Sequence, residues 1–120
     1  MRDISIANIR YLPPPAEWPE WYVYVGRSAP RRGLKRSPLA NIYLVGDYSP
    51  DLGRRFTRQE VIALYASNVL GQPMPGFERE LGRVRTLLAK HGKLILVCWC
   101  APRACHAEVI RDALLAEVEG

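Results

Sequence analysis

The sequence has no apolar run long enough to cross a membrane, and its first residues contain no apolar segment typical of a signal peptide. A membrane-spanning helix needs about 20 predominantly apolar residues, and a signal peptide needs an apolar stretch of about 7–15 residues. These absences argue against membrane insertion and secretion. We therefore expect a cytoplasmic protein with no membrane partner.

Cysteine is scarce, and its distribution is uneven. Only three cysteines are present, and all lie within residues 98–105. An odd number of cysteines packed so closely does not suit a disulfide framework, and free thiols are typical of a reducing compartment. We expect all three to be reduced, and we expect the fold to form without a metal or other cofactor.

Lysine and acidic residues are also few. Arginine supplies 14 of the 17 basic residues, against 12 acidic ones, and the net charge is +5. Arginine makes planar, bidentate contacts with phosphate, so the excess favours an anionic partner, although +5 is also an ordinary charge for a soluble surface. The phosphate-cradling GxxxxGK[ST] motif is absent, and Glu60 and Glu108 are the only acids near the motifs below. Whether the protein is an enzyme stays open.

What is present is typical of one globular domain over residues 1–120, with 48% apolar and 24% charged residues. Residues 94–97 are all apolar, as expected for a strand buried on both faces of a sheet. Apolar residues then recur at helical spacing after Cys105. The C-terminal third therefore predicts a strand, a tight loop and a helix.

The remaining segments predict further strands and helices. Thr57 and Glu60 have the spacing of a helix capping box. In chain order we expect a strand at 4–9, a proline-rich connection completing the N-terminal segment 1–20, a strand at 21–25, a basic loop at 28–38, a short strand at 41–45, and helices at 57–70 and 77–91. This order favours a compact three-layer α/β domain with a small, mostly parallel or mixed sheet.

The loop after the strand at 94–97 is the main candidate site. Ligands of open α/β sheets bind beyond the carboxyl ends of strands, against helix N-termini. Cys98, Cys100, Cys105 and His106 could bind zinc, although Cys-x-Cys is tighter than the usual spacing. Alternatively, Cys105 or His106 could take part in catalysis, the loop could bind an anion or sugar, or the small side chains could simply fill the core.

A second group of candidates follows the strand at 21–25. Gly26 permits close backbone approach, Arg27 can neutralise a phosphate, and Asn41 can read an amide or base edge. Ser37 lies in the same region. The basic loop could contact nucleic acid through three arginines, Arg31, Arg32 and Arg36.

Taken together, these segments resemble a bacterial and phage family, domain of unknown function 4326. The resemblance covers about residues 23–115. It is carried by four segments in the same order, and the last of them is the most specific. They are Val25-Gly26-Arg27, Ser37-Pro38-Leu39-x-Asn41, Thr57-Arg58-x-Glu60-x-Ile62-x-x-Tyr65, and Leu96-x-Cys98-Trp99-Cys100-x-Pro102-x-x-Cys105-His106.

Two positions depart from the family pattern. Ala107 stands where the family usually has glycine, and Ile42 stands where it usually has proline. A similar strand–Cys–Pro–Cys–His–helix arrangement occurs in a second family that ends in Cys-His-Arg and looks Rossmann-like. The resemblance therefore implies a Rossmann-like domain whose pocket includes Trp99 and Pro102.

The function that we expect is binding of an anionic small molecule, nucleotide-like or phosphorylated sugar-like, with a role in nucleotide metabolism. One alternative is a non-catalytic phage or bacterial module that sequesters a nucleotide signal or contacts nucleic acid. A second alternative is a zinc-stabilised adaptor. The residues predict no particular oligomeric state.

Overall fold

The computed structural model describes residues 2–119 and contains five strands and three α-helices within them. Short 3₁₀ turns lie at Ile9–Tyr11, Pro15–Glu17 and Pro30–Arg32. The elements, in chain order, are β1 (Asp3–Asn8), β2 (Tyr22–Tyr24), β3 (Tyr48–Ser49), β4 (Arg54–Arg55), α1 (Arg58–Leu64), α2 (Pro75–His91), β5 (Lys93–Cys98) and α3 (His106–Glu119).

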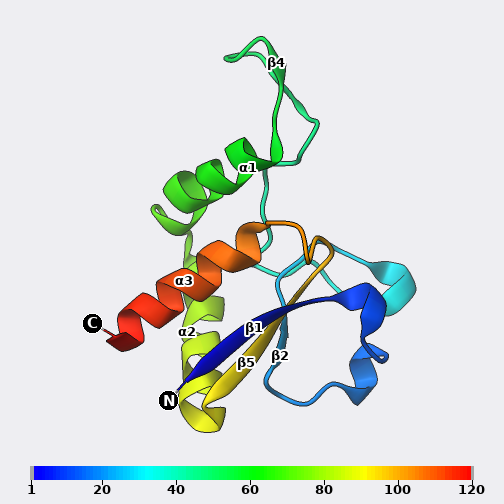
Figure 1. Ribbon diagram of the computed structural model, residues 1–120, viewed down its shortest axis with the longest axis vertical. Helices are drawn as coiled ribbons and strands as arrows, with labels where there is room; N and C mark the ends of the chain where they lie inside the picture. Colours follow the sequence, from blue (N-terminus) through cyan, green and yellow to red (C-terminus); the bar gives the residue numbers. More distant parts are fainter. Residues whose placement is uncertain (1, 120) are drawn as a thin grey trace.

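A three-stranded parallel sheet lies at the centre of the fold, in the order β1-β5-β2 (Figure 1). β1 pairs along all six residues of β5, and β2 pairs with Ile95, Leu96 and Val97. The apolar run predicted to be a buried strand is therefore the central strand, because only a central strand has neighbours on both edges. The small α/β domain with a mostly parallel sheet is confirmed.

The sheet is covered on both faces. Ile4 and Leu96 point to one face and belong to the same buried cluster as the apolar side chains of α2 and α3, so both helices pack there. Val97 points to the opposite face and is also buried. On that face Trp18, from the proline-rich connection, lies with its ring centroid 6.0 Å from that of Tyr22. The third layer is thus an irregular segment rather than a helix.

The residues predicted to begin and end helices do so in the structure. Thr57 caps α1, and its side chain and that of Glu60 form the reciprocal hydrogen bonds of a capping box. The helix continues beyond Leu64 as a π-helical turn, Tyr65–Leu70. Gly92 ends α2 in the left-handed conformation, with φ of 71°. No helix within the described residues is long and apolar enough to span a membrane.

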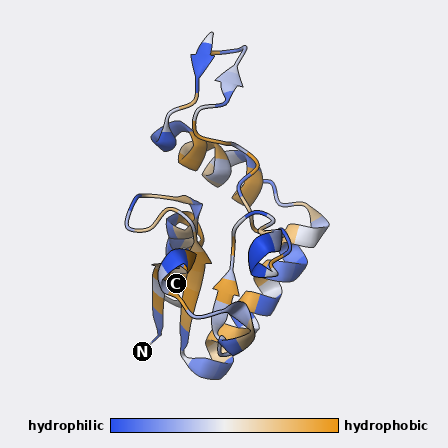
Figure 2. Cartoon of the chain, turned by 90° about the vertical axis from the view of Figure 1, so that its right-hand side faces the viewer, coloured by the Kyte–Doolittle hydropathy of each residue, from blue (hydrophilic) through white to orange (hydrophobic). Residues whose placement is uncertain are grey.

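The short strand predicted at 41–45 is wrong. The Asn41 side chain accepts a hydrogen bond from Tyr43 N (2.9 Å) and donates one to Val61 O (3.0 Å), so the chain turns there. The following residues, 46–56, form a projecting arm in which β3 and β4 pair antiparallel (Figure 1). The tip of this arm is coloured as largely hydrophilic in Figure 2, in contrast to the orange central strands.

Candidate functional site

The carboxyl ends of the three parallel strands lie at one edge of the sheet, and the N-terminus of α3 faces the same edge (Figure 1). A cavity of about 360 Å³ opens there. Its wall consists of residues from β5 and the loops that follow β2 and β5, from the segment before the arm, and from α1 and α3. They are Gly26, Arg27, Ser28, Asn41, Tyr43, Val45, Arg58, Val61, Ile62, Cys98, Trp99, Cys100, Ala104, Cys105 and His106.

The cysteine loop, residues 99–105, is held in place from two sides. Asn8, at the end of β1, donates hydrogen bonds from Nδ2 to the carbonyls of Trp99 and Ala101, both at 3.0 Å. Arg58, the first residue of α1, donates one to the carbonyl of Ala104 at 3.1 Å. The loop is therefore positioned by residues remote from it in sequence.

Tyr24 connects the two strand ends. Its hydroxyl donates to the carbonyl of Arg27 (2.5 Å) and accepts from Nε1 of Trp99 (2.7 Å). A Cβ at position 26 would lie only 2.5 Å from this hydroxyl oxygen, so Gly26 is required for the tyrosine to fold back over the turn. The predicted close approach at Gly26 thus serves a side chain of the protein itself.

His106 is the first residue of α3, and its ring lies against Tyr65 with 5.0 Å between centroids. Nε2 lies 2.6 Å from the carbonyl of Val25 and must donate, because a carbonyl only accepts. Burial lowers the pKa of His106, and the charge of Arg27 lowers it further. The ring is therefore neutral at pH 7, with the proton on Nε2, and Nδ1 is left as an acceptor.

The three cysteines are free thiols and form one cluster. Cys105 lies close enough to both other sulfurs to share its single proton with either of them, which raises its own pKa and keeps it protonated. The same proximity lowers the pKa of Cys98 to about 7 and that of Cys100 to about 6, and Arg58 lowers the latter further. Cys98 and Cys105 are buried, whereas Cys100 is partly exposed to the cavity.

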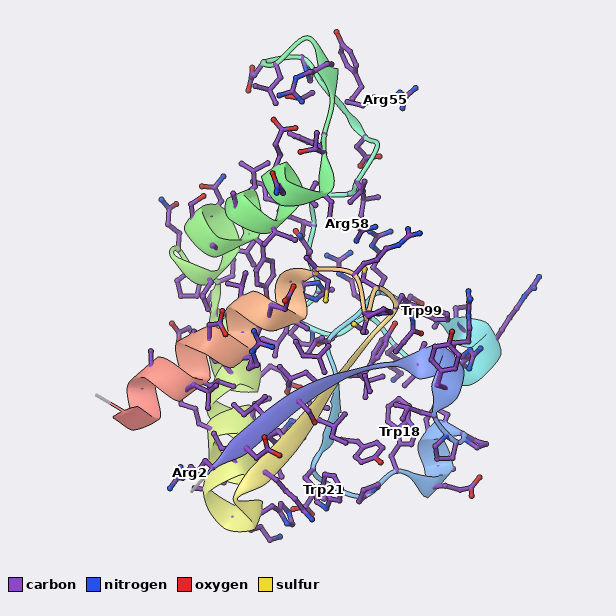
Figure 3. All side chains as sticks on the ribbon, viewed as in Figure 1. Arg2, Trp18, Trp21, Arg55, Arg58 and Trp99 are labelled. Carbon is purple, nitrogen blue, oxygen red and sulfur yellow. The ribbon has the colours of Figure 1, made fainter. Side chains whose placement is uncertain are left out.

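Two arginines border the cavity. Arg27 follows β2, and Arg58 lies at the start of α1, between this helix and the cysteine loop (Figure 3). Neither forms an ion pair with a carboxylate among the described residues. Arg32, in the basic loop (residues 28–38), places its guanidinium 5.4 Å from the ring centroid of Trp99. The cavity therefore has an uncompensated positive rim.

Most of the predicted site residues line this cavity, but the polar groups of some of them are hydrogen-bonded within the protein. Both polar groups of the Asn41 side chain are used within the protein, so it supports the wall rather than reading a ligand. Ser37 is buried, and its hydroxyl accepts from Leu39 N. Pro102 is exposed and, like Ser37, does not line the cavity.

Three residues that shape the site were not predicted to do so from sequence. Asn8 and Tyr24 act through hydrogen bonds at strand ends, and Arg58 lines the cavity itself. Arg58 follows the capping threonine directly, and a cation at the first turn of a helix is unusual because it faces the positive end of the dipole. This unusual position is the feature of the sequence from which a binding role of Arg58 could have been predicted.

No group of three or more His, Cys, Asp or Glu side chains within residues 2–119 is arranged to hold a metal ion. The three thiols are free and lie beside one another, and Nε2 of His106 is occupied by Val25. The residues of the zinc hypothesis therefore lie together but have other partners.

A family model described as Domain of unknown function (DUF4326) matches residues 15–116. The chain belongs to this family. The DUF4326 match spans most of the chain and includes every residue of the cavity wall. No curated protein and no solved structure matches the chain. The DUF4326 description names no activity, so the cavity is the best guide to function.

Proposed function

We propose that this DUF4326 domain binds a nucleotide-like or phosphorylated sugar-like small molecule in the cavity at the strand ends. The observation that supports the proposal is the convergence of two unpaired arginines, Arg27 and Arg58, on a cavity of about 360 Å³. Ligand pockets typically measure about 300–1,000 Å³, and arginine recognises phosphate through paired hydrogen bonds.

The phosphate is expected to contact the arginines rather than the start of α3. A helix N-terminus normally attracts anions through free N–H groups. Here the N–H of Cys105 already donates to the carboxylate of Glu108 at 3.0 Å. That carboxylate also repels an approaching phosphate. The guanidinium groups of Arg27 and Arg58 therefore make the better anion site.

The rest of the ligand would occupy the aromatic side of the cavity. Trp99 is 43% exposed and Tyr43 also lines the wall, so a base or sugar ring can stack on an aromatic face. Nδ1 of His106 can accept a hydrogen bond from a ligand N–H or O–H. These groups suit a molecule with an anionic end and a planar or hydroxylated end, as a nucleotide has.

Calorimetric titration with adenosine monophosphate, ribose 5-phosphate and adenosine tests the proposal. We expect the two phosphorylated compounds to bind and adenosine to bind at least about tenfold more weakly, because it lacks the group that the arginines recognise. Arg58→Gln should weaken binding of the phosphorylated compounds, and Arg79→Gln on α2 should not. Equal binding of adenosine, or no binding of any of the three, would contradict the proposal.

A second candidate function is contact with nucleic acid. Arg31, Arg32 and Arg36 are exposed, and the cation–π contact of Arg32 with Trp99 joins the basic loop to the cavity rim. A nucleic-acid strand could therefore place phosphates on this loop and a base over the cavity. This is the reason to test oligonucleotides beside mononucleotides.

A further inference from the structure

The three cysteines differ in what can reach them. Cys98 is 1% exposed and Cys105 4% exposed, and both belong to the buried apolar cluster. Cys100 only packs against the edge of that cluster and is partly exposed in the cavity wall. All three cysteines line the cavity, but Cys100 is the most exposed of them, so its sulfur is the one that a molecule inside the cavity reaches most readily.

The surroundings of Cys100 favour a negative charge on its sulfur. Arg27 and Arg58 line the same cavity as Cys100. The neighbouring thiol of Cys105 and the charges of the two arginines lower the pKa of the Cys100 thiol to about 6. Cys105 keeps its proton and lies close enough to share it with Cys100. A thiolate held by two cations and a neighbouring donor is the reactive form of cysteine. Ordinary core packing requires none of these three contacts.

We propose that Cys100 is a nucleophile that forms a covalent bond with an anionic electrophile bound between Arg27 and Arg58. In this step the Cys100 sulfur donates an electron pair to an electrophilic carbon of the bound molecule. The bond from that carbon to its leaving group breaks, and the leaving group departs with the bonding pair. No proton moves, because the sulfur is already deprotonated and Cys105 keeps its own proton.

The same arginines would hold the anionic group of the substrate and the sulfur that attacks it. An anion is normally repelled by a thiolate, so an ordinary cysteine prefers a neutral electrophile. Two cations beside the sulfur reverse that preference by raising the local concentration of anions. The inference rests on the cavity for which nucleotide binding is proposed, but its chemistry can be tested without a nucleotide.

The test compares alkylation by iodoacetate, which is anionic, with alkylation by iodoacetamide, which is neutral and similar in size. Peptide mass spectrometry of the folded protein then identifies the modified cysteine. We expect Cys100 to be modified first with both reagents, and we expect iodoacetate to react faster by about tenfold. The rate should rise with pH with a midpoint near 6, where the thiolate forms.

Variants show which side chains cause the preference for iodoacetate and the reactivity of Cys100. Arg58→Gln should remove most of the preference for iodoacetate, whereas Arg79→Gln, a matched change on α2, should keep it. Cys105→Ala should slow alkylation of Cys100 at pH 6 with both reagents, because the sulfur loses a hydrogen-bond donor. The wild-type comparison needs no variant, so a variant that fails to fold leaves the test intact.

Three outcomes would overturn the inference: faster reaction of Cys100 with iodoacetamide, earlier modification of Cys98 or Cys105, or protection of all three by a tightly bound metal. Adenosine monophosphate should slow alkylation of Cys100 if it occupies the cavity. Should it not bind while the preference for iodoacetate persists, nucleotide binding fails and the nucleophile stands.

Discussion

At the scale of single residues, His106 shows how one side chain connects the sheet to the last helix. Its Nε2–H donates to the carbonyl of Val25, at the end of β2, while its ring packs on Tyr65. The residue thus holds the N-terminus of α3 against the strand end that borders the cavity. Burial favours the neutral ring, because a charged imidazole would have to be desolvated in this position, and this effect outweighs the hydrogen bond to Val25, which favours the charged form.

We therefore expect stability to fall as the pH drops below about 6.5, the ordinary pKa of histidine. Burial lowers the pKa of folded His106, so in this range the unfolded chain binds a proton that the folded chain does not, and protonation favours unfolding. The stabilisation is complete above pH 6.5 and is lost as the pH falls toward the pKa of the folded state. Urea unfolding between about pH 8 and about pH 5 measures this decline.

The variant His106→Asn should lose about 1–3 kcal/mol at neutral pH, because it breaks a buried hydrogen bond and leaves a gap against Tyr65. It should also show a flatter decline between about pH 6.5 and about pH 5. His91→Asn is the matched control at the end of α2, where the half-buried His91 contacts only the exposed side chain of Glu20 across 2.9 Å, and it should retain most of the wild-type decline. A variant of His106 as stable as wild type would show that the residue is not part of the core.

Arg27 is expected to matter for binding and not for folding. Its side chain is exposed, forms no ion pair among the described residues, and adds positive charge near His106 and the positive end of α3. We expect Arg27→Ala to leave the melting temperature within about two degrees or to raise it. Binding of adenosine monophosphate should weaken at least about tenfold, or about 1.4 kcal/mol. Unfolding of this variant would contradict the assignment.

At the scale of secondary structure, the start of α1 sets the position of Arg58. Oγ1 of Thr57 accepts from the N–H of Glu60 at 3.2 Å, and the Glu60 carboxylate accepts from the N–H of Thr57 at 2.8 Å. Arg54 also pairs with this carboxylate, and these contacts lower the pKa of Glu60 to about 2. The carboxylate therefore stays charged under all ordinary conditions.

Removing the cap should loosen both the helix and the cavity wall. We expect Thr57→Ala to lower the free energy of unfolding by about 1 kcal/mol, and Thr57→Ser to have little effect, because serine keeps the acceptor. Thr86→Ala is the matched control, since Thr86 lies inside α2 and its hydroxyl bonds only to Gly82 O. Urea unfolding should rank Thr57→Ala below wild type and Thr86→Ala at or above it.

The elements differ in how far the sequence could predict them. α2 and β5 follow from apolar spacing, and the start of α1 follows from its capping box, because these signals are local. Residues 41–45 look like a strand locally, but the Asn41 amide bonds to Val61, twenty residues away, and turns the chain. Each strand of the arm has only two residues, too few to leave a pattern.

In the candidate site, too, local sequence patterns could be interpreted, whereas contacts between distant residues could not. The motif residues from Cys98 to His106 could be placed near a strand end because strand, loop and helix are consecutive. The contacts that hold them come from Asn8 and Arg58, which are far away in sequence. Nor could the sequence distinguish Cys100 from Cys98 and Cys105, because their difference in exposure depends on where β5 ends.

At the scale of the whole molecule, the basic loop and two arginines of the cavity wall form one group of positive charges without carboxylate partners among the described residues. Arg54, Arg83 and Arg85 pair with carboxylates elsewhere on the surface, so their charges are compensated. The basic loop contains no acidic residue, and no carboxylate among the described residues pairs with its arginines. Part of the uncompensated charge behind the net value of +5 therefore lies on the basic loop and at Arg27 and Arg58 in the cavity wall.

This distribution predicts how any nucleic-acid affinity should behave. We expect binding of a single-stranded oligonucleotide to weaken steeply as salt is raised, because each phosphate contact releases counterions. Changing Arg31, Arg32 and Arg36 together to glutamine should abolish binding without lowering the melting temperature, since all three side chains are exposed. The measurement is fluorescence anisotropy of a labelled oligonucleotide at several salt concentrations.

A matched triple variant separates local contacts from net charge. Arg10, Arg79 and Arg111 lie away from the cavity, and changing them to glutamine lowers the net charge by the same amount. If the basic loop makes the contacts, this control should keep most of the affinity and nearly the same dependence on salt. If both triple variants lose affinity equally, attraction comes from overall charge alone, and the basic loop is not a binding surface.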